Sequence, residues 1–239
     1  MTELEAIKSR HSVRQYKEDA IPEEIVKILQ DEIDIINKEQ GFNFQLVTND
    51  PNAFTGFFAH YGNFTGVRNY IAIIAKKDKD VQVGYFTEKL VLKIQALGLN
   101  SCICASSISK SKALATVGKD EKFYLGVCFG YGVKQGVDHK NKPIESLYEI
   151  ESGEAPEWFM KGMECALLAP TAINQQKFKI IYKADGKCKA ISKFGPCSKL
   201  DLGIVCIILK LVLEKKMLYG HKMVHKQSIL DCFYYDNVV

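Results

Sequence analysis

The chain has 239 residues, of which 47% are hydrophobic and 25% are charged, and its formal net charge is +4. This length suffices for one substantial core or two small, closely joined ones, and the composition is typical of a soluble globular protein. The basic excess is mild and no basic run is interleaved with aromatic side chains, so we expect no nucleic-acid partner. The most apolar run, Leu202–Leu213, is shorter than the roughly 20 residues of a membrane span, so we expect no membrane partner.

The cysteines and the N-terminus indicate the compartment. None of the eight cysteines forms a Cys-x-x-Cys pair, and several lie inside apolar runs, where a reduced cysteine behaves as a small hydrophobe. Residues 1–8 lack the apolar core of a signal peptide. Together these features predict a protein of the reducing cytoplasm.

The first motif along the chain is Arg10-His11-Ser12-Val13-Arg14. An extended backbone would point Arg10, Ser12 and Arg14 to the same side. Two planar guanidinium groups flanking a hydroxyl suit a phosphate, because each guanidinium offers paired donors. The alternative interpretation is solvated arginines near a terminus, and so short a pattern leaves it open.

Helix and strand signals alternate through the first half of the chain. Apolar spacing of 3.6 residues predicts one helix between Pro22 and Gly41 and another over 83–97, with Gly98 after its end. Strands are predicted at 42–47, 70–75 and 123–129. The loop 49–67 is rich in aromatic residues that either pack the loop onto the body or cover a ligand. The small residues of 99–107 suit either a crowded turn or the close approach of a flat ring.

The second half contains a compact cluster of amide and hydroxyl side chains. A helical stripe ending near Leu167 is followed by Pro170 and then by Thr171, Asn174, Gln175 and Gln176. These uncharged groups donate and accept hydrogen bonds, which suits a planar heterocycle such as a flavin. A polar helix-to-strand loop is the alternative. A strand at 178–182, a hairpin turn at Asp185-Gly186 and an apolar helix over 202–216 with Asp201 as its cap are predicted next.

A weak internal repeat follows from this order. Each half offers a helix, a polar turn, a strand and a later helix with a glycine near its start, Gly84 in the first half and Gly203 in the second. We therefore expect one domain over residues 1–216, built from halves at about 1–145 and 146–216 that pack about a pseudo-twofold axis. Residues 217–239 are expected to form an atypical tail. His221 and His225 in this tail are four residues apart and could share a helical face as metal ligands, but no clear further ligands accompany them, so surface histidines are expected.

Taken together, these motifs resemble the FMN-dependent nitroreductase family. Residues 10–14 are similar to its Arg-x-Ser-x-Arg signature, and Ala169–Gln176 is similar to its Ala-Pro-Ser-x-x-Asn-x-Gln signature. Leu97-Gly98-Leu99 and Leu125–Gly132 resemble its late helix, flavin-facing turn and last strand. The resemblance covers roughly residues 5 to 205. The late position of the amide signature is similar to that in a divergent nitroreductase subgroup of bacteria and archaea.

The resemblance implies an α+β, nitroreductase-like fold, with a central, mostly antiparallel sheet flanked by helices. Ordinary members of the family are intertwined homodimers that bind FMN at the subunit interface. The two-half interpretation suggests that one chain supplies both sides of a site here. The expected assembly is therefore a monomeric pseudo-dimer or a homodimer.

The resemblance also implies roles for individual residues. Arg10, Ser12 and Arg14 would hold the FMN phosphate and ribityl chain, with Lys134 as a further phosphate candidate, and backbone N–H groups of Ala105 and Ser106 would lie near the redox-active nitrogen. Asn174 and Gln176 would bond the ribityl chain or the ring edge. No catalytic side chain and no metal ligand are expected. The complete predicted cofactor-binding set is Arg10, His11, Ser12, Arg14, Ala105, Ser106, Lys134, Pro170, Thr171, Asn174, Gln175 and Gln176.

The implied activity is that of an FMN-dependent oxidoreductase, with NADH or NADPH as co-substrate. Reducing equivalents would pass through bound FMN to a small-molecule acceptor, either a nitroaromatic or a quinone-like compound. Two alternatives remain open from the sequence. One is a related flavin enzyme with different chemistry, and the other is a flavin-binding or degenerate family member without reductase activity.

Overall fold

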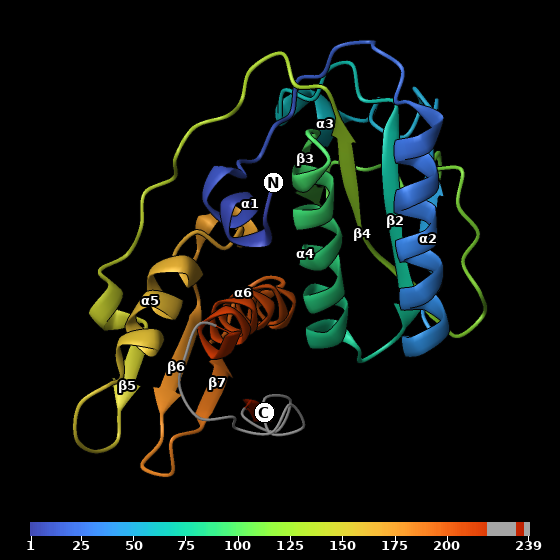
Figure 1. The fold of residues 1–239 in the computed structure, drawn as a ribbon. Coiled ribbons are helices and arrows are strands. Elements are labelled where there is room, and N and C mark those ends of the chain that lie inside the picture. Colours follow the sequence, from blue (N-terminus) through green and yellow to red (C-terminus); the bar gives the residue numbers. More distant parts are fainter. Residues whose placement is uncertain (219–232, 237–239) are drawn as a thin grey trace. The chain divides into compact units, whose positions relative to one another are not determined.

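The computed structural model describes residues 1–218 and 233–236 (Figure 1). Most of the predicted tail 217–239, including His221 and His225, therefore lies outside the described residues. The chain forms two compact units, one made of residues 1–79 and 87–138 and the other of residues 80–86 and the described residues from 139 onward. The elements in chain order are α1 (Glu3–Ser9), α2 (Glu23–Gln40), β1 (Gln45–Val47), α3 (Phe57–Tyr61), β2 (Asn69–Lys76), α4 (Asp80–Ala96), β3 (Asn100–Cys104), β4 (Glu121–Gly130), η1 (Ile144–Ser146), β5 (Tyr148–Ile150), α5 (Glu157–Ala166), η2 (Ala172–Asn174), β6 (Phe178–Tyr182), β7 (Cys188–Ser192), α6 (Ser198–Leu218) and β8 (Phe233–Asp236).

The first unit contains an antiparallel sheet in the order β1-β2-β4-β3. Strand β2 is buried along its whole length except at Lys76, so apolar side chains line both of its faces. Tyr70, Ala72 and Ile74 face a cluster that includes Val13 from the N-terminal segment. The alternate β2 residues point to the opposite face. A strand covered on both sides explains why 70–75 is a continuous hydrophobic run rather than an alternating one.

Helix α2 has the buried stripe and the glycine C-cap that the sequence predicts. Its stripe of Leu29, Ile33 and Ile36 is fully buried, as the 3.6-residue spacing predicts. Gly41 ends the helix in the left-handed region, with φ of 65°, and its N–H bonds the carbonyl of Asn37. Helix α4 likewise ends just before Gly98, which has φ of 81°.

The second unit has its own sheet, in the order β5-β6-β7-β8. Strands β6 and β7 form the predicted antiparallel hairpin, and Gly186 takes a φ of 81° in its turn. Strand β5 pairs with β6, and β8 with β7, in parallel. Helices α5 and α6 pack together, and Gly162 of α5 lies close to Leu209 of α6. The antiparallel pairs across the two sheets outnumber the parallel ones, as predicted.

Two glycines allow the first turns of α4 to contact α6 within the second unit. A β-carbon on Gly84 would lie 2.0 Å from the carbonyl oxygen of Leu200, and one on Gly203 would lie 2.0 Å from the carbonyl oxygen of Val81. Each glycine thus faces the carbonyl of the residue that lies three positions before the other glycine, on the opposing helix. These are the two glycines that the sequence repeat places near the starts of equivalent helices.

Three sequence predictions need correction. Helix α6 begins at Ser198, so Asp201 lies in its first turn and is not its cap; the carboxylate accepts hydrogen bonds from the Ala172 N–H and the Gln175 amide instead. The strand expected at 42–47 is shortened to β1, because the Asn37 side chain occupies both backbone groups of Phe44. Part of the small-residue segment 99–107 is strand β3, paired with β4.

Among the described residues, none of the helices combines the length and the hydropathy that crossing a membrane requires.

Candidate functional site

The segment after α1 is held in place by backbone hydrogen bonds in the first unit. The Val13 N–H donates to Ser101 at 3.0 Å, and the Thr65 N–H donates to Arg14 at 3.0 Å. The carbonyl of Gln15 accepts from the N–H of Val133 at 2.9 Å. The segment is thus extended and bonded at several points along its length. The backbone that carries its side chains is therefore already ordered before a ligand binds.

A cavity of about 210 Å³ opens beside this segment. Its cationic residues are Arg14 and Lys134, and Ser12 belongs to the same lining. None of the described lining residues is acidic, so the cavity has the electrostatic character of an anion site. The lining consists of Ser12, Val13, Arg14, Gln15, Gly62, Asn63, Lys134 and Gly136.

Neighbouring residues fix the shape of the cavity. The guanidinium carbon of Arg14 lies 5.9 Å from the centre of the Phe64 ring, a cation–π distance that holds the arginine over the aromatic face. Gly136 has φ of 81°, and a β-carbon there would lie 2.6 Å from the β-carbon of His11. His11 itself faces Asp138, with 3.8 Å between Nε2 and Oδ1. His11 therefore supports the wall that Gly136 forms and is not itself part of the lining.

Arg10 lies apart from this pocket. It is the C-terminal cap of α1, its N–H bonds the carbonyl of Ala6, and its side chain is buried. Its Nε is 3.8 Å from Oε1 of Glu88, a carboxyl that is fully buried on α4. Burial raises the pKa of Glu88 to about 7, while the positive charge of Arg10 opposes the rise. Arg10 therefore pairs with Glu88 and does not line the cavity, and its contact with a ligand stays a prediction.

Ala105 and Ser106 follow β3 directly and are exposed. Neither residue lines the cavity. Their predicted backbone contact with a flavin ring stays a prediction.

The predicted amide cluster lies in the second unit and makes a tight turn. Asn174 and Gln176 both adopt left-handed backbone conformations, with φ of 53° and 43°. The amide of Gln176, which is 1% exposed, accepts from the Lys142 N–H at 2.7 Å and donates to Asn141 at 2.9 Å and to the Leu167 carbonyl. Its own N–H is bonded to the hydroxyl of Thr171. The turn thus anchors the linker that follows residue 139.

Gln175 and Asn174 also bond within the second unit. The Gln175 amide donates to the Pro196 carbonyl and to Asp201 Oδ2, both at 2.7 Å. Burial raises the pKa of Asp201 to about 6, against the hydrogen bonds that the carboxylate accepts. The exposed Asn174 donates to the carbonyl of Lys140. Pro170 precedes the turn and is half-buried. Ligand binding by Pro170, Thr171, Asn174, Gln175 and Gln176 stays a prediction.

Some lining residues are absent from the predicted set. Gly62, Asn63 and Gly136 belong to segments that backbone hydrogen bonds, such as those of Thr65 to Arg14 and of Val133 to Gln15, bring to the N-terminal segment. The glycine and asparagine content of 49–67 marks that loop as a set of turns, and Asn63 has φ of 57°. That local signal identifies a turn but does not say what the turn faces.

Comparisons with known proteins match nearly the whole chain. Residues 3–212 match the model of a family described as "Putative TM nitroreductase". The crystal structure of a putative nitroreductase from Thermotoga maritima MSB8 shares 26% identity and a TM-score of 0.65, over 94% of this chain and 91% of that one. A putative nitroreductase from Desulfovibrio desulfuricans, solved in complex with FMN, shares 20% identity and a TM-score of 0.51, over 65% of this chain and 99% of that one. A comparison with curated proteins finds no match. These structural matches confirm the predicted α+β, nitroreductase-like fold.

Proposed function

We propose that this chain, which belongs to the family described as "Putative TM nitroreductase", is an FMN-dependent oxidoreductase. Its electron donor would be NADH or NADPH, and its acceptors would be nitroaromatic or quinone-like compounds. The observation that carries the proposal is the cationic cavity formed by Ser12, Arg14 and Lys134 on the fixed N-terminal segment. The FMN bound by the similar Desulfovibrio desulfuricans protein adds support.

The cavity suits the phosphate end of FMN. A phosphate monoester carries a charge of about −1.5 to −2 at neutral pH and offers several strong acceptor oxygens. Arg14 supplies a planar pair of donors, Lys134 supplies a compact positive charge, and Ser12 supplies a neutral donor. A volume of about 210 Å³ is smaller than the roughly 300–1,000 Å³ of sites that enclose a drug-sized ligand. The cavity therefore fits a phosphate and its nearest carbons rather than a whole flavin.

The protein's own contribution to the reaction would be binding and orientation. When bound, FMN supplies the redox chemistry, which no side chain in the set provides. Arg14, held over Phe64, and Lys134 would neutralise the phosphate, and Ser12 would fix its rotation. Because the backbone of this segment is already hydrogen-bonded, little ordering is required when the anion arrives.

The direct test is the visible spectrum of the purified full chain with FMN, recorded anaerobically before and after adding NADH or NADPH. We expect a flavin spectrum that either nicotinamide bleaches and that a nitroaromatic or quinone restores. Bleaching without turnover of these acceptors would favour a related flavin enzyme with different chemistry. A flavin spectrum that neither nicotinamide bleaches would favour a binding protein without reductase activity. No flavin signal after FMN is added would refute the proposal.

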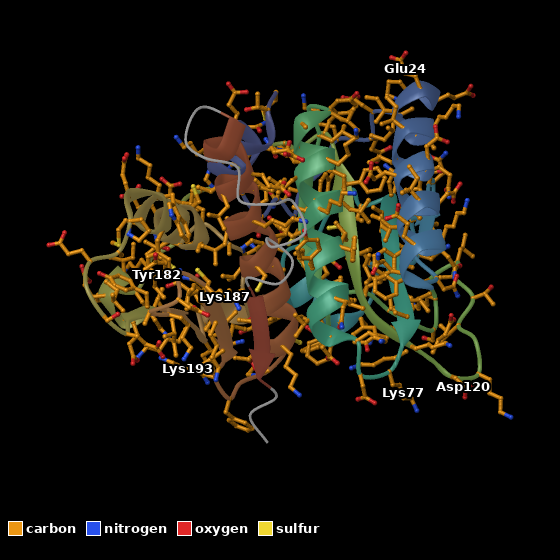
Figure 2. The ribbon with its side chains drawn as sticks, turned by 60° about the horizontal axis from the view of Figure 1, so that its bottom comes forward. Glu24, Lys77, Asp120, Tyr182, Lys187 and Lys193 are labelled. Atoms are coloured by element: carbon orange, nitrogen blue, oxygen red, sulfur yellow. The ribbon has the colours of Figure 1, made fainter. Side chains whose placement is uncertain are left out.

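Substitutions test the cavity itself. A charge-assisted hydrogen bond contributes about 1.5–3 kcal/mol, so Arg14→Ala should weaken FMN binding about 10- to 100-fold. Lys134→Ala should also weaken FMN binding. The matched control is Lys77→Ala, because Lys77 is an exposed lysine of the same unit that projects away from the body and does not line the cavity (Figure 2). Equal FMN affinity in all three variants would remove the phosphate assignment.

For the assembly, we propose a monomeric pseudo-dimer. A twofold axis makes residue i meet residue j and residue j meet residue i, and Gly84 and Gly203 show this reciprocity within one chain. The two helices that carry them would then be equivalent elements of the two predicted halves. Sedimentation of the purified protein should give the mass of one chain. A stable homodimer would be the other predicted assembly and would contradict the proposal.

The cytoplasm is the compartment that we propose, on the basis of the cysteine usage and the N-terminal composition described above.

A further inference from the structure

Three cysteine thiols lie together in the core of the first unit, on one face of β3 and β4. The sulfur atoms of Cys104 and Cys128 are 3.7 Å apart, and both thiols also contact the carbonyl of Cys102. The hydroxyl of Tyr16 lies 3.5 Å from the sulfur of Cys128. All three cysteines are free and buried. Neither the anion cavity nor the proposed flavin chemistry uses them.

The strand register selects one pair among the three. Cys102 lies directly opposite Cys128 in the antiparallel ladder, whereas Cys104 lies opposite Gly126. Directly opposed residues of such a ladder have α-carbons about 4.5–5.5 Å apart, within the roughly 4.4–6.8 Å that a disulfide requires. Diagonal neighbours such as Cys104 and Cys128 are generally farther apart. The register thus allows a bond between Cys102 and Cys128 after a side-chain rotation, because the sulfur of Cys128 now contacts that of Cys104.

The geometry favours Cys102 as the nucleophile of the pair, because it is 4% exposed whereas Cys128 is fully buried, and its neighbour Ser101 is bridged to Ser12 of the cavity lining. Hydrogen bonds from the Cys104 and Cys128 thiols hold the pKa of the Cys102 thiol well below its usual range, and the charge of Arg14 and the hydroxyl of Ser12 add to the effect against burial. Burial raises the pKa of Cys128. A thiolate attacks peroxides, whereas a thiol does not.

Residues that line the anion cavity also lie next to the strand that carries Cys102. Ser12 and Arg14, which both act on Cys102, also line the anion cavity. Ser12 is joined to the residue before Cys102 by an isolated parallel bridge with Ser101. A small oxidant in the cavity would therefore lie beside Ser12, whose backbone is bridged to the neighbour of Cys102, and would reach the sulfur, which is only 4% exposed, from this side.

We propose that Cys102 and Cys128 are a modification site at which hydrogen peroxide forms a reversible intramolecular disulfide. The Cys102 thiolate attacks one peroxide oxygen, the O–O bond breaks, and the departing hydroxide takes up a proton to leave as water. The sulfur of Cys128 then attacks the resulting sulfenic acid, the S–O bond breaks and a second water leaves. Two thiols are oxidised by two electrons and one peroxide is reduced to two waters. A dithiol reductant reverses the bond by exchange.

The experiment uses the reduced full chain, treated with hydrogen peroxide, alkylated and then analysed by mass spectrometry. The expected product has lost two hydrogen atoms and joins the peptide that contains residue 102 to the peptide that contains residue 128. Dithiothreitol should restore two alkylatable thiols. Continued alkylation of both cysteines, under conditions that oxidise the exposed Cys197, would overturn the proposal.

Variants identify the two sulfur atoms. Cys102→Ser and Cys128→Ser should each abolish the linkage, whereas Cys104→Ser and the surface control Cys197→Ser should retain it. In Cys128→Ser, dimedone should trap a sulfenic acid at Cys102. A disulfide that survives Cys102→Ser and disappears in Cys104→Ser would contradict the pairing. If a buried variant does not fold, the linkage in the wild-type chain together with Cys104→Ser still decides the outcome.

Discussion

Replacing Gly84 or Gly203 by alanine should destabilise the protein, because each glycine faces a backbone carbonyl of the opposing helix. A β-carbon on Gly84 would lie 2.0 Å from the carbonyl oxygen of Leu200, whereas ordinary contacts begin at 3.4 Å. Alanine at this position therefore requires the helices to separate by about 1.4 Å, the difference between these distances. The opposing atom belongs to a helical backbone and cannot rotate away.

Two energies compete in Gly84→Ala. Alanine inside a helix gains up to about 1 kcal/mol over glycine, whereas overpacking costs about 1–3 kcal/mol and more where backbone must move. Because a whole helix must shift, we expect a net loss of about 1–2 kcal/mol or more in the free energy of unfolding. Gly203→Ala should lose a similar amount, since its β-carbon meets the Val81 carbonyl at the same distance.

Gly162→Ala is the matched control, because this helical glycine faces only the end of the Leu209 side chain, at 3.1 Å. A side chain can rotate, so the helix-propensity gain should leave Gly162→Ala at least as stable as the wild type. The assay is equilibrium denaturation by urea for the three single variants and the double variant. Because one separation of the helices relieves both contacts, the losses in Gly84→Ala/Gly203→Ala should be less than additive. A Gly84→Ala protein that is as stable as Gly162→Ala would refute this reasoning.

Further predictions concern buried charge, the cavity wall and the linker. Since the pKa of Glu88 is raised from 4.5 to about 7, the folded state binds this proton more tightly, so its contribution to stability should fall as pH rises through that window; Glu88→Gln should flatten the dependence in pH-resolved denaturation. Gly136→Ala should weaken binding of inorganic phosphate in calorimetry, whereas Gly153→Ala, also at positive φ but in open space, should leave it unchanged; equal affinities would argue against the wall. Gln176→Ala removes the amide bonded to the Lys142 N–H and to the Asn141 side chain, so tryptic cleavage after Lys140 should accelerate, and an unchanged rate would contradict the anchoring role.

Local patterns predicted much of the fold because the forces that they report act between near neighbours in sequence. The apolar stripe of α2 and the positive φ of Gly41 follow from helix periodicity and C-cap geometry. The β6–β7 hairpin follows from the Asp185-Gly186 pair. Strand β3 escaped detection because its small residues lack the bulky alternation of a typical strand, and its pairing with β4 supplies the stability.

For the site, the sequence by itself determined which residue types were available and where along the chain they lay. It placed Ser12 and Arg14 in one motif and proposed Lys134 as a distant partner. Only the tertiary structure decided that these three share a cavity while Arg10 turns to Glu88. The reason is that α1 ends at Ser9, immediately before the motif, so that Arg10 is the cap of this helix and its buried side chain pairs with Glu88. The hydrogen bonds that bring Lys134 to Ser12 join segments far apart in sequence, and no local pattern encodes such a meeting.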